Sequence, residues 1–392
     1  MSAPVASPGL PDLRYGEAEE ELRAAVRKLI ADRSPLTTVL ARAETADPYD
    51  PGTWQALAAD LGCAGLLIPE SRGGAGASYR EAAVVAEETG RGALPVPYLA
   101  SAVMATAALL PSADELLAAL ADGSLTAALT VPFTTMPPAV SGAALASGVR
   151  VGRPGPGDPA GQARLTGTVA GAADALPAGV LLVPADGVPF GLYAVDASAP
   201  EVTVSPVVSL DTTRPLADLT FANAPARPVA TGEAAVQAVS AALTAGAAML
   251  ACEQLGVAQR CLEMTVAYLK ERRQFGRAVG SFQALKHRLA DVWVALIQAR
   301  AAARYAAACL ADGDPDTPVA VVLAKSACGE AAVQAAQECV QLHGGIGFTW
   351  EHPAHLLLKR ARSGSAGFGT PDRHRAALAG LVNLPPPGGS IG

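Results

Sequence analysis

The chain has 392 residues, of which 51% are apolar and 17% are charged, and its formal net charge is −7. This length and apolar content predict a globular protein of two or three domains with a large buried core. No block of lysine or arginine stands out, so the sequence argues against nucleic acid or an anionic membrane as a partner. The sequence therefore favours a function in small-molecule chemistry over binding to nucleic acid or membranes.

The first 124 residues have the pattern of a helical domain. Apolar residues recur at three- and four-residue spacing in EEELRAAVRKLIADR, PGTWQALAADLG, YREAAVVAEETGRG and ADELLAALADG, and each stretch stops at glycine or a polar cluster. The chain start lacks the basic beginning and apolar core of a signal peptide, and the six cysteines are scattered singly. We therefore expect free thiols and a cytoplasmic protein.

Residues 125–232 have the pattern of a small β domain. Helical periodicity disappears there, and short apolar runs such as LTAALTVPF, GVLLVPA and FGLYAVDA are separated by proline, glycine and aspartate.

Helical patterning returns over residues 233–384, where we expect a C-terminal four-helix bundle. Apolar residues spaced for one helical face continue from Phe282 to Leu296, and Thr317 and Pro318 mark the start of a further helix, with threonine as its N-cap. The charge-free stretch from Ala234 to Cys252 is rich in alanine and carries polar residues, so it predicts a helix inside the bundle rather than a membrane span. Residues 385–392 (PPPGGSIG) are expected to be a disordered tail.

Two stretches of the bundle carry a specific resemblance. YLKERRQFGRAVGSFQALKHRLADVWV (268–294) and CVQLHGGIGFTWEHPAHLLLKRA (339–361) are similar to the two best signatures of the FAD-dependent acyl-CoA dehydrogenase family, and WQALAADLGCAGLLIPESRGGAGAS (54–78) resembles its N-terminal element. The resemblance covers nearly the whole chain, with the middle domain matching least. It implies a multi-domain α+β fold: an N-terminal helical domain, a middle β domain and a C-terminal four-helix bundle.

The resemblance also implies contacts to FAD. Arg272, Gln274 and Phe275 fall on the family pattern, and arginine suits a diphosphate because its planar fork donates two charge-assisted hydrogen bonds. Arg273 and Arg277 are better explained as solvated charges. In the second stretch, the family pattern assigns flavin-nucleotide contacts to Gln341, Gly344 and Gly345, although on sequence alone the glycines could simply end a helix. In the family these elements reach across a dimer interface to the neighbouring subunit's FAD.

Family members oxidise an acyl-CoA between its α and β carbons, with a carboxylate that removes the α proton while hydride goes to the flavin. Here the usual glutamate position, one residue before Gly369 and Thr370, is Phe368, and the alternative position is Gly246. Glu253 lies on the same expected helix but seven residues later, about 10 Å along its axis, which makes it a poor substitute.

The middle domain departs from the family in the same direction. Only a hydrophobic strand and Pro132 remain of the family's Thr-Glu-Pro element, and Gly171 and Ala173 stand where a Trp-Ile-Thr/Ser packs on the flavin. Elements for a subunit's own site are therefore missing, and elements for the neighbour's FAD are present.

These losses suggest the non-catalytic half of a hetero-oligomer that completes the FAD site of a related acyl-CoA dehydrogenase subunit. A self-sufficient homo-oligomer with an unusual base and a flavin-free scaffold on the same fold are the alternatives. The expected substrate is an acyl-CoA of lipid metabolism, and the expected electron acceptor is an electron-transfer flavoprotein or a similar protein. We expect no metal, because Pro353 separates His352 from His355 and no further ligand follows.

Overall fold

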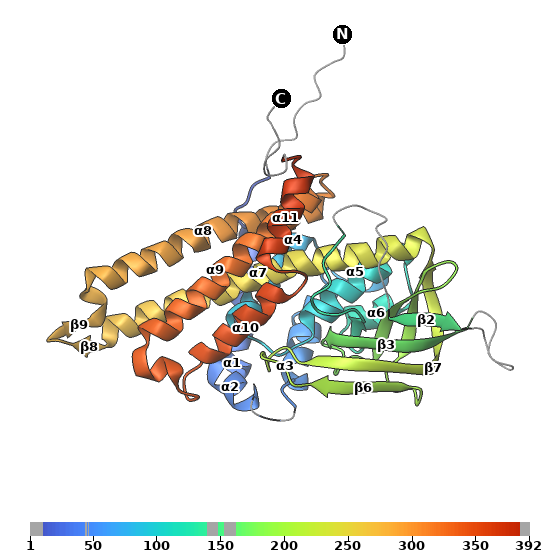
Figure 1. Ribbon diagram of the computed structural model, residues 1–392, viewed down its shortest axis with the longest axis horizontal. Coiled ribbons are helices and arrows are strands. Elements are labelled where there is room, and N and C mark those ends of the chain that lie inside the picture. Colours follow the sequence, from blue (N-terminus) through green and yellow to red (C-terminus); the bar gives the residue numbers. More distant parts are fainter. Residues whose placement is uncertain (1–10, 44, 46, 139–147, 153–161, 385–392) are drawn as a thin grey trace, which may run out of the picture.

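The computed structural model describes residues 11–43, 45, 47–138, 148–152 and 162–384. Long helices run through the elongated molecule, with a β-sheet at one end and a small hairpin at the other (Figure 1). The predicted α+β fold class, with helices before and after a middle sheet, is confirmed. The tail expected to be disordered lies outside the described residues.

The N-terminal part is helical. Its α-helices are α1 (Glu17–Arg33), α2 (Leu36–Ala43), α3 (Pro51–Gln55), α4 (Tyr79–Arg91), α5 (Thr106–Leu109) and α6 (Leu116–Ala121). Apolar spacing predicted α1, α3, α4 and α6, but not α2 or α5. Asp50 caps α3 and Ser78 caps α4 by accepting hydrogen bonds from backbone N–H groups of the first turn. A π-helical segment, Tyr98–Ala105, precedes α5 and was not anticipated. It is buried on every side, so its sequence has no polar face that could reveal a helical period.

The middle part is a seven-stranded sheet. Its strands are β1 (Ala127–Leu129), β2 (Val149–Gly152), β3 (Ala163–Ala173), β4 (Val180–Ala185), β5 (Gly191–Asp196), β6 (Val202–Val207) and β7 (Leu216–Thr231). The order is β1-β4-β5-β7-β3-β2, and β6 also pairs with the long strand β7. The β1–β4 pair is parallel and the other strand pairs are antiparallel. Alternate residues such as Leu165, Leu219 and Phe221 form this part's own apolar core.

The C-terminal part is helical. It comprises α7 (Glu233–Glu271), α8 (Gln283–Asp312), α9 (Thr317–Leu342), α10 (Ala354–Ala366) and α11 (Pro371–Leu381), and the two-residue strands β8 (Arg273–Gln274) and β9 (Arg277–Ala278) join α7 to α8. Although α7 and α9 are apolar and long enough to cross a membrane, 72% and 67% of their most apolar windows are buried inside the protein. One detail of the prediction was wrong: Asp316, rather than Thr317, is the residue before the first turn of α9, because the Thr317 hydroxyl bonds back to the carbonyls of Cys309 and Asp314.

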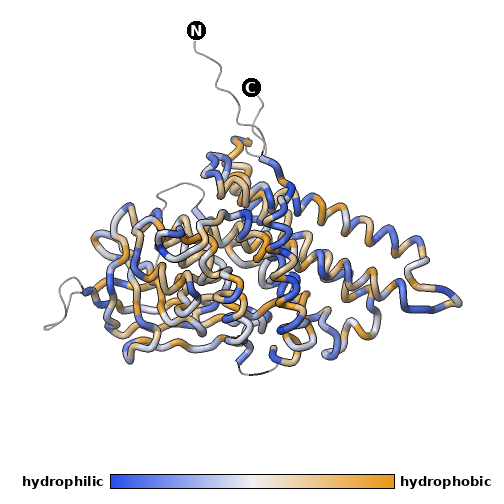
Figure 2. Tube along the Cα trace, turned by 180° about the vertical axis from the view of Figure 1, so that it is seen from behind, coloured by the Kyte–Doolittle hydropathy of each residue, from blue (hydrophilic) through white to orange (hydrophobic). Residues whose placement is uncertain are grey.

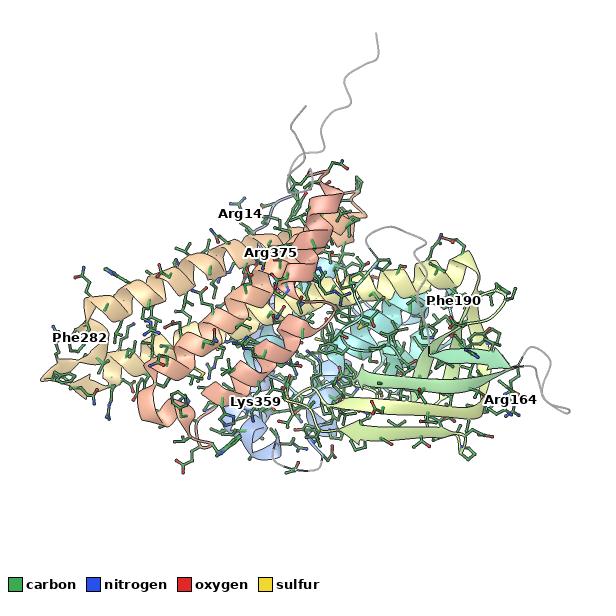
Figure 3. The ribbon with its side chains drawn as sticks, in the orientation of Figure 1. Arg14, Arg164, Phe190, Phe282, Lys359 and Arg375 are labelled. Carbon is green, nitrogen blue, oxygen red and sulfur yellow. The ribbon has the colours of Figure 1, made fainter. Side chains whose placement is uncertain are left out.

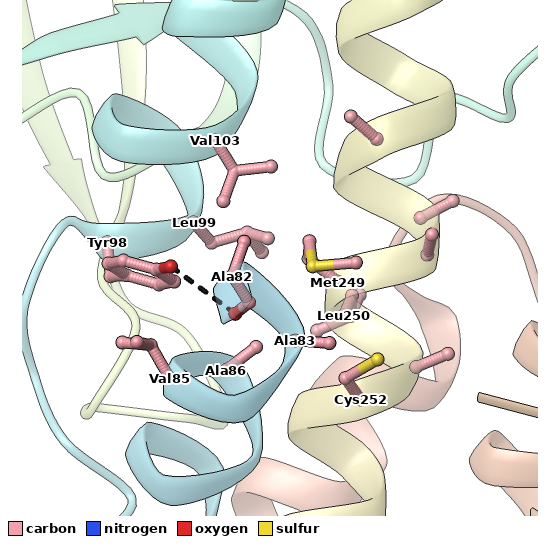
Figure 4. Packing of buried hydrophobic residues seen from close by; sticks show 14 of the residues in the cluster. Ala82, Ala83, Val85, Ala86, Tyr98, Leu99, Val103, Met249, Leu250 and Cys252 are labelled. Atoms are coloured by element: carbon pink, nitrogen blue, oxygen red, sulfur yellow. Dashed lines mark hydrogen bonds between the residues drawn. The ribbon is translucent and has the colours of Figure 1, made fainter. Parts of the chain in front are cut away.

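The helices α4 and α7 cross at very short range. A Cβ at Gly90 would lie 2.0 Å from the carbonyl oxygen of Glu253, and one at Gly256 would lie 1.9 Å from that of Glu87. Only glycine permits this approach. Figure 4 shows the result: Met249, Leu250 and Cys252 of α7 lie beside alanines of α4, and the Tyr98 hydroxyl donates to the Ala82 carbonyl at 3.3 Å. Hydrophobic residues accordingly concentrate in the middle of the molecule, whereas the tip of the β8–β9 hairpin is hydrophilic (Figure 2).

A buried ionic cluster connects all three parts. Glu253 of α7 accepts from Arg214 (3.1 Å, Nη1 to Oε1), which directly precedes the β7 strand region, and from Arg360 of α10 (2.9 Å, Nε to Oε1). Asp174, at the end of β3, accepts from the Tyr49 hydroxyl at 2.8 Å and lies 3.9 Å from the Arg214 Nε. All four charged side chains are at least 95% buried. We call Glu253, Arg214, Arg360, Asp174 and Tyr49 the ionic hub.

Replacing Glu253 with Gln is expected to lower the free energy of unfolding by about 3–5 kcal/mol, because the buried Arg214 and Arg360 lose the carboxylate they share and keep only the more distant Asp174 (3.9 Å) and Asp211 (3.6 Å). Urea denaturation measures the change. Glu233→Gln, at the exposed start of the same helix, is the matched control and should cost less than about 1 kcal/mol. Equal effects of the two substitutions would contradict the role assigned to the hub.

The same substitution has a pH signature. Burial alone would raise the pKa of Glu253, but Arg214 and Arg360 outweigh it and lower the pKa from 4.5 to about 2. A lowered carboxyl pKa stabilises the fold above pH 4.5, and this contribution is lost as the pH falls toward 2. The wild type should therefore lose more stability than Glu253→Gln across that window.

Candidate functional site

Both candidate positions for the catalytic glutamate meet at one point of the structure. Phe368 follows α10 in a left-handed backbone conformation (φ 53°), and its ring is 98% buried. A Cβ built at Gly246 would lie 3.2 Å from the Cζ of Phe368 and 2.9 Å from Met104. A side chain at position 246 and a phenyl ring at position 368 therefore compete for the same space. The sequence identified both positions but not that they are neighbours.

The Phe368 loop is held in place on all sides. The Phe368 N–H donates to the Phe133 carbonyl at 2.7 Å, and the two rings meet edge to face with centroids 5.4 Å apart. On the other side, His374 Nε2 lies 2.9 Å from the Phe368 carbonyl. Burial lowers the pKa of His374 to about 4, so near neutral pH the imidazole is uncharged and Nε2–H donates this hydrogen bond. Phe368 is thus a packed core residue rather than a mobile loop tip.

Little space is left around this ring. The cavity bounded by Phe368, Phe133, Met104 and the segment Leu99–Ala100 has a volume of about 10 Å³, roughly enough for a single water molecule. A neighbouring cavity of about 190 Å³ lies beside Pro132 and Thr168, and its wall contains no carboxylate among the described residues. Neither cavity combines room for an acyl chain with a proton acceptor.

The two middle-domain segments that differ from the family pattern are paired with each other. The Phe133 N–H donates to the Gly171 carbonyl at 2.9 Å, and Pro132 forms an isolated β-bridge with Ala172. Gly171 itself has φ 63°, and its N–H donates to Asp218 at 2.8 Å. Ala173 continues the strand and lines the small cavity beside Phe368. Backbone pairing therefore joins the segments that in the family face the flavin ring.

Glu253, the weak sequence candidate for a base, is committed to the ionic hub. Both of its oxygens accept from arginines, and its side chain is 95% buried. A carboxylate with a pKa near 2 and two guanidinium partners is a poor proton acceptor.

Two ionisable groups near the Phe368 loop were missed by sequence reasoning. Asp174 lines the small cavity, burial raises the pKa of its carboxyl group, and its Oδ2 has no hydrogen-bond partner among the described residues. Lys325 of α9 is completely buried, and burial lowers the pKa of its ammonium group to about 7. Its Nζ donates to the Gly364 carbonyl at 2.9 Å. Neither residue belongs to a sequence motif, so only the fold reveals them.

The expected FAD-contacting residues lie at the other end of the molecule. The β8–β9 hairpin and the turn after α9 are both at the end of the bundle away from the sheet (Figure 1). Figure 3 shows Phe282, beside this hairpin, far from Phe190 and Arg164 in the β domain. Stacking of Tyr268 on His343, with ring centroids 4.6 Å apart, joins the base of the hairpin to the end of α9. The structure thus brings the two sequence motifs together.

Within the hairpin, Arg272 ends α7 and its backbone N–H donates to the Tyr268 carbonyl at 2.8 Å. Gln274 is exposed on β8, and Phe275 is 87% exposed at the tip with φ 52°. Arg277 is exposed, and its guanidinium group lies 3.8 Å from the centroid of the Phe282 ring. In the described part of the chain, Arg272 has no ion-pair partner.

The turn after α9 is a 3₁₀ segment, Gly344–Phe348. Gln341, Gly344 and Gly345 are exposed, and Gly344 has φ 63°. Among the described residues, apart from its own chain neighbours and helical turn, no atom lies within 4 Å of a Cβ built at Gly345, and its φ is not in the left-handed region. The chain's own packing therefore does not require glycine there, whereas close approach of a ligand or another chain would.

The neighbouring histidines have local structural roles. His352 lies against His343, with ring centroids 4.4 Å apart, and accepts from the Ala354 N–H at 3.2 Å. The described residues contain no group of three or more histidine, cysteine or acidic side chains suited to a metal ion.

Comparison with known proteins agrees with this arrangement. Residues 16–115 match the acyl-CoA dehydrogenase N-terminal domain, and residues 236–381 match the acyl-CoA dehydrogenase C-terminal domain. Acyl-CoA dehydrogenase IpdE2 of Mycobacterium tuberculosis is 35% identical over 353 residues, covering 89% of this chain and 92% of that protein. The chain belongs to the acyl-CoA dehydrogenase family.

Further members of this family show similarity over most of the chain. FadE34 of Mycobacterium tuberculosis is 37% identical over 311 residues, which are 79% of this chain but 39% of that protein. The structure of the ChsE4-ChsE5 complex from Mycobacterium tuberculosis has a TM-score of 0.82 at 25% identity, covering 96% of this chain and all of that one. The Tcur3481-Tcur3483 steroid ACAD variant has a TM-score of 0.81 at 29% identity, covering 94% of this chain and 98% of that one.

Phe368→Ala is expected to lower the free energy of unfolding by about 3–5 kcal/mol, because it removes a buried ring from the core. Phe275→Ala, which truncates an exposed ring, is the control and should change stability by less than about 0.5 kcal/mol. Urea denaturation measures both.

A double-mutant cycle tests the contact itself. Gly246→Ala should be strongly destabilising in the wild type but much less so together with Phe368→Ala, since truncation of the ring makes room for the new Cβ. Additive effects would mean that positions 246 and 368 are not in contact.

Proposed function

We propose that this chain is the non-catalytic subunit of a hetero-oligomeric acyl-CoA dehydrogenase. In this proposal it completes the FAD site of a related, catalytic partner subunit that oxidises an acyl-CoA thioester. The main support is the filled cleft around Phe368: both family positions for the base are apolar, and a cavity of about 10 Å³ remains between them. Proton abstraction from the α carbon of a thioester requires a carboxylate at the substrate and room for that substrate, and the described cavity has no carboxylate at either family position and no room for an acyl chain.

The exposed end of the bundle is suited to contacting FAD that is bound to a partner subunit. Arg272 is exposed and has no ion-pair partner among the described residues, the Phe275 ring is exposed, and internal packing does not require glycine at Gly345. With Gln274, Gln341 and Gly344, they would hold FAD bound mainly to the partner. When bound, FAD supplies the hydride acceptor of the reaction. The role of this chain is to hold it: Arg272 can donate two charge-assisted hydrogen bonds to a phosphate group, and the glycine turn allows close backbone approach.

The relatives make a two-chain assembly a natural hypothesis. The ChsE4-ChsE5 structure is described as a complex, and the Tcur3481-Tcur3483 steroid ACAD carries two chain names. The matched region spans only 39% of FadE34, which is therefore about twice as long as this chain and has room for a second unit of the same size. We infer a cytoplasmic complex whose electrons pass to an electron-transfer flavoprotein or a similar acceptor. Because the similar Tcur3481-Tcur3483 protein is a steroid ACAD, we propose a steroid-derived acyl group as the substrate class.

One observation favours a second candidate, a self-sufficient enzyme with an unusual base. Asp174 lines the cavity next to Phe368, and its Oδ2 accepts no hydrogen bond from the described residues, although it lies 3.9 Å from the Arg214 Nε. Burial raises the pKa of its carboxyl group, which is the direction that a general base needs. Its hydrogen bond from Tyr49 and the lack of room for a substrate count against this role. Loss of turnover in Asp174→Asn, in a preparation of this chain alone, would support it.

Arg272→Ala is expected to weaken FAD retention in the assembled complex by roughly ten- to a hundredfold, the loss of a charge-assisted hydrogen bond worth about 1.5–3 kcal/mol. Arg273→Ala, one residue later in the same hairpin, is the matched control and should have much less effect. Flavin absorbance per complex after gel filtration measures retention. Equal flavin loss in both variants would mean that the motif is placed incorrectly.

Activity of the isolated chain separates the alternatives. Wild type and Phe368→Glu, each reconstituted with FAD, should both be inactive toward a panel of acyl-CoA thioesters with an artificial electron acceptor. A glutamate at position 368 adds a proton acceptor, but Gly171 and Ala173 still stand where the family has the side chains that contact the flavin.

The outcomes of this assay are distinct. Turnover by the isolated wild type would contradict the non-catalytic role, and turnover by Phe368→Glu alone would reveal a competent flavin site that lacks only its base. Co-expression with related chains should instead yield a yellow complex with both subunits, and a stable but flavin-free complex would favour a scaffold.

A further inference from the structure

A separate cavity lies between the N-terminal helices and α7, outside the region around Phe368. Its volume is about 330 Å³, within the range of small-molecule sites. Three arginines contribute to its wall: Arg27 from α1, Arg91 from the end of α4 and Arg260 from α7. Ile30 and Leu36 provide an apolar side. No motif of the sequence pointed to this cavity.

The positive charges of this cavity are only partly neutralised. Arg27 donates to Glu88 at 2.9 Å and 2.7 Å, and one arm of Arg91 pairs with Glu263. The Nη1 of Arg91 is buried and has no hydrogen-bond partner in the part of the chain that the structure describes. Among those same residues, Arg260 forms no ion pair. Three arginines therefore face two glutamates in a protein whose net charge is −7.

An uncompensated guanidinium group is costly when it is withdrawn from water. Arg260 is half-buried, and burial together with the charge of Arg91 lowers the pKa of its guanidinium group. A bound anion would remove this cost, because it could accept from the guanidinium group of Arg260 in a cavity whose wall also contains the positive charge of Arg91. The apolar side of the cavity suits a ligand with a hydrocarbon part.

We propose that this cavity binds a small amphipathic anion, with its carboxylate or phosphate head group on Arg260 and Arg91 and its apolar part against Ile30 and Leu36. Carboxylate and phosphate share the chemistry that the two arginines recognise. The inference does not rest on the proposed role of the chain in a hetero-oligomer, since neither FAD nor a partner subunit takes part in it.

Isothermal titration of the full-length protein at low salt tests the proposal with three probes of equal chain length: hexanoate, hexyl phosphate and neutral hexanol. Saturable binding of at least one anion, with no binding of hexanol, is expected. The tighter of the two anions identifies the head group. Binding should weaken as salt is added, because ions screen the arginines. No saturable binding of either anion at millimolar concentration, or equal binding of hexanol, would overturn the proposal.

A matched pair of variants locates the site. Arg260→Gln should weaken anion binding roughly tenfold or more. Arg33→Gln makes the same change of charge at the exposed end of α1 and should alter it by less than about twofold. Equal affinity of Arg260→Gln and the wild type would contradict the assignment. If Arg260→Gln does not fold, Arg260→Lys preserves the charge but removes the planar fork, and weaker binding of hexyl phosphate to it is expected.

Discussion

The arrangement of the three parts depends on one buried carboxylate. Glu253 lies where α7, the region before β7 and α10 meet, and it neutralises Arg214 and Arg360 at the same time. Arg214 belongs to the middle part and Arg360 to the same C-terminal part as Glu253, so the middle and C-terminal parts must dock for one carboxylate to pair with both arginines. Tyr49 connects the N-terminal part to the hub through its hydrogen bond to Asp174. The hub also extends to the Phe368 loop, because the Arg214 guanidinium lies 5.7 Å over the Phe133 ring that packs on Phe368.

This constraint explains why an acidic residue close to the expected active site need not be a catalytic one. A general base must exchange protons near neutral pH, whereas Glu253 must remain ionised for the fold to hold. On α7, Glu253 thus provides a carboxylate that stabilises the fold, whereas Gly246, the family's alternative position for the base, has no side chain. At the C-terminal end of that helix, the β8–β9 hairpin and the Gly344–Phe348 turn are exposed, and most of their side chains make few contacts within the described chain. The long helix α7 thus connects the filled region around Phe368 to the exposed β8–β9 hairpin.

Much of the fold could be predicted from the sequence, because amphipathic helices such as α1 and α4 have a clear apolar period and the middle strands are marked by glycine and proline. The Tyr98–Ala105 segment could not, since a helix buried on all sides has no such period. The motifs at Arg272 and Gly344 could be located by their resemblance to a family. Other features involve residues that are far apart in the sequence: the contact between Phe368 and Gly246, the location of Asp174 near Phe368, and the cavity at Arg260. Local patterns carry no information about such contacts.

The fit of the Phe368 ring against Gly246 makes the two positions strongly epistatic. With the ring in place, even a methyl group at position 246 meets Phe368 and Met104 at close range, so a glutamate could not be regained there by a single substitution. Phe368→Glu is unfavourable for a different reason, because it would introduce a charge among aromatic and aliphatic neighbours. Each route to a catalytic carboxylate therefore begins with a less stable protein. The contact between these two positions therefore opposes the introduction of a carboxylate at either of them.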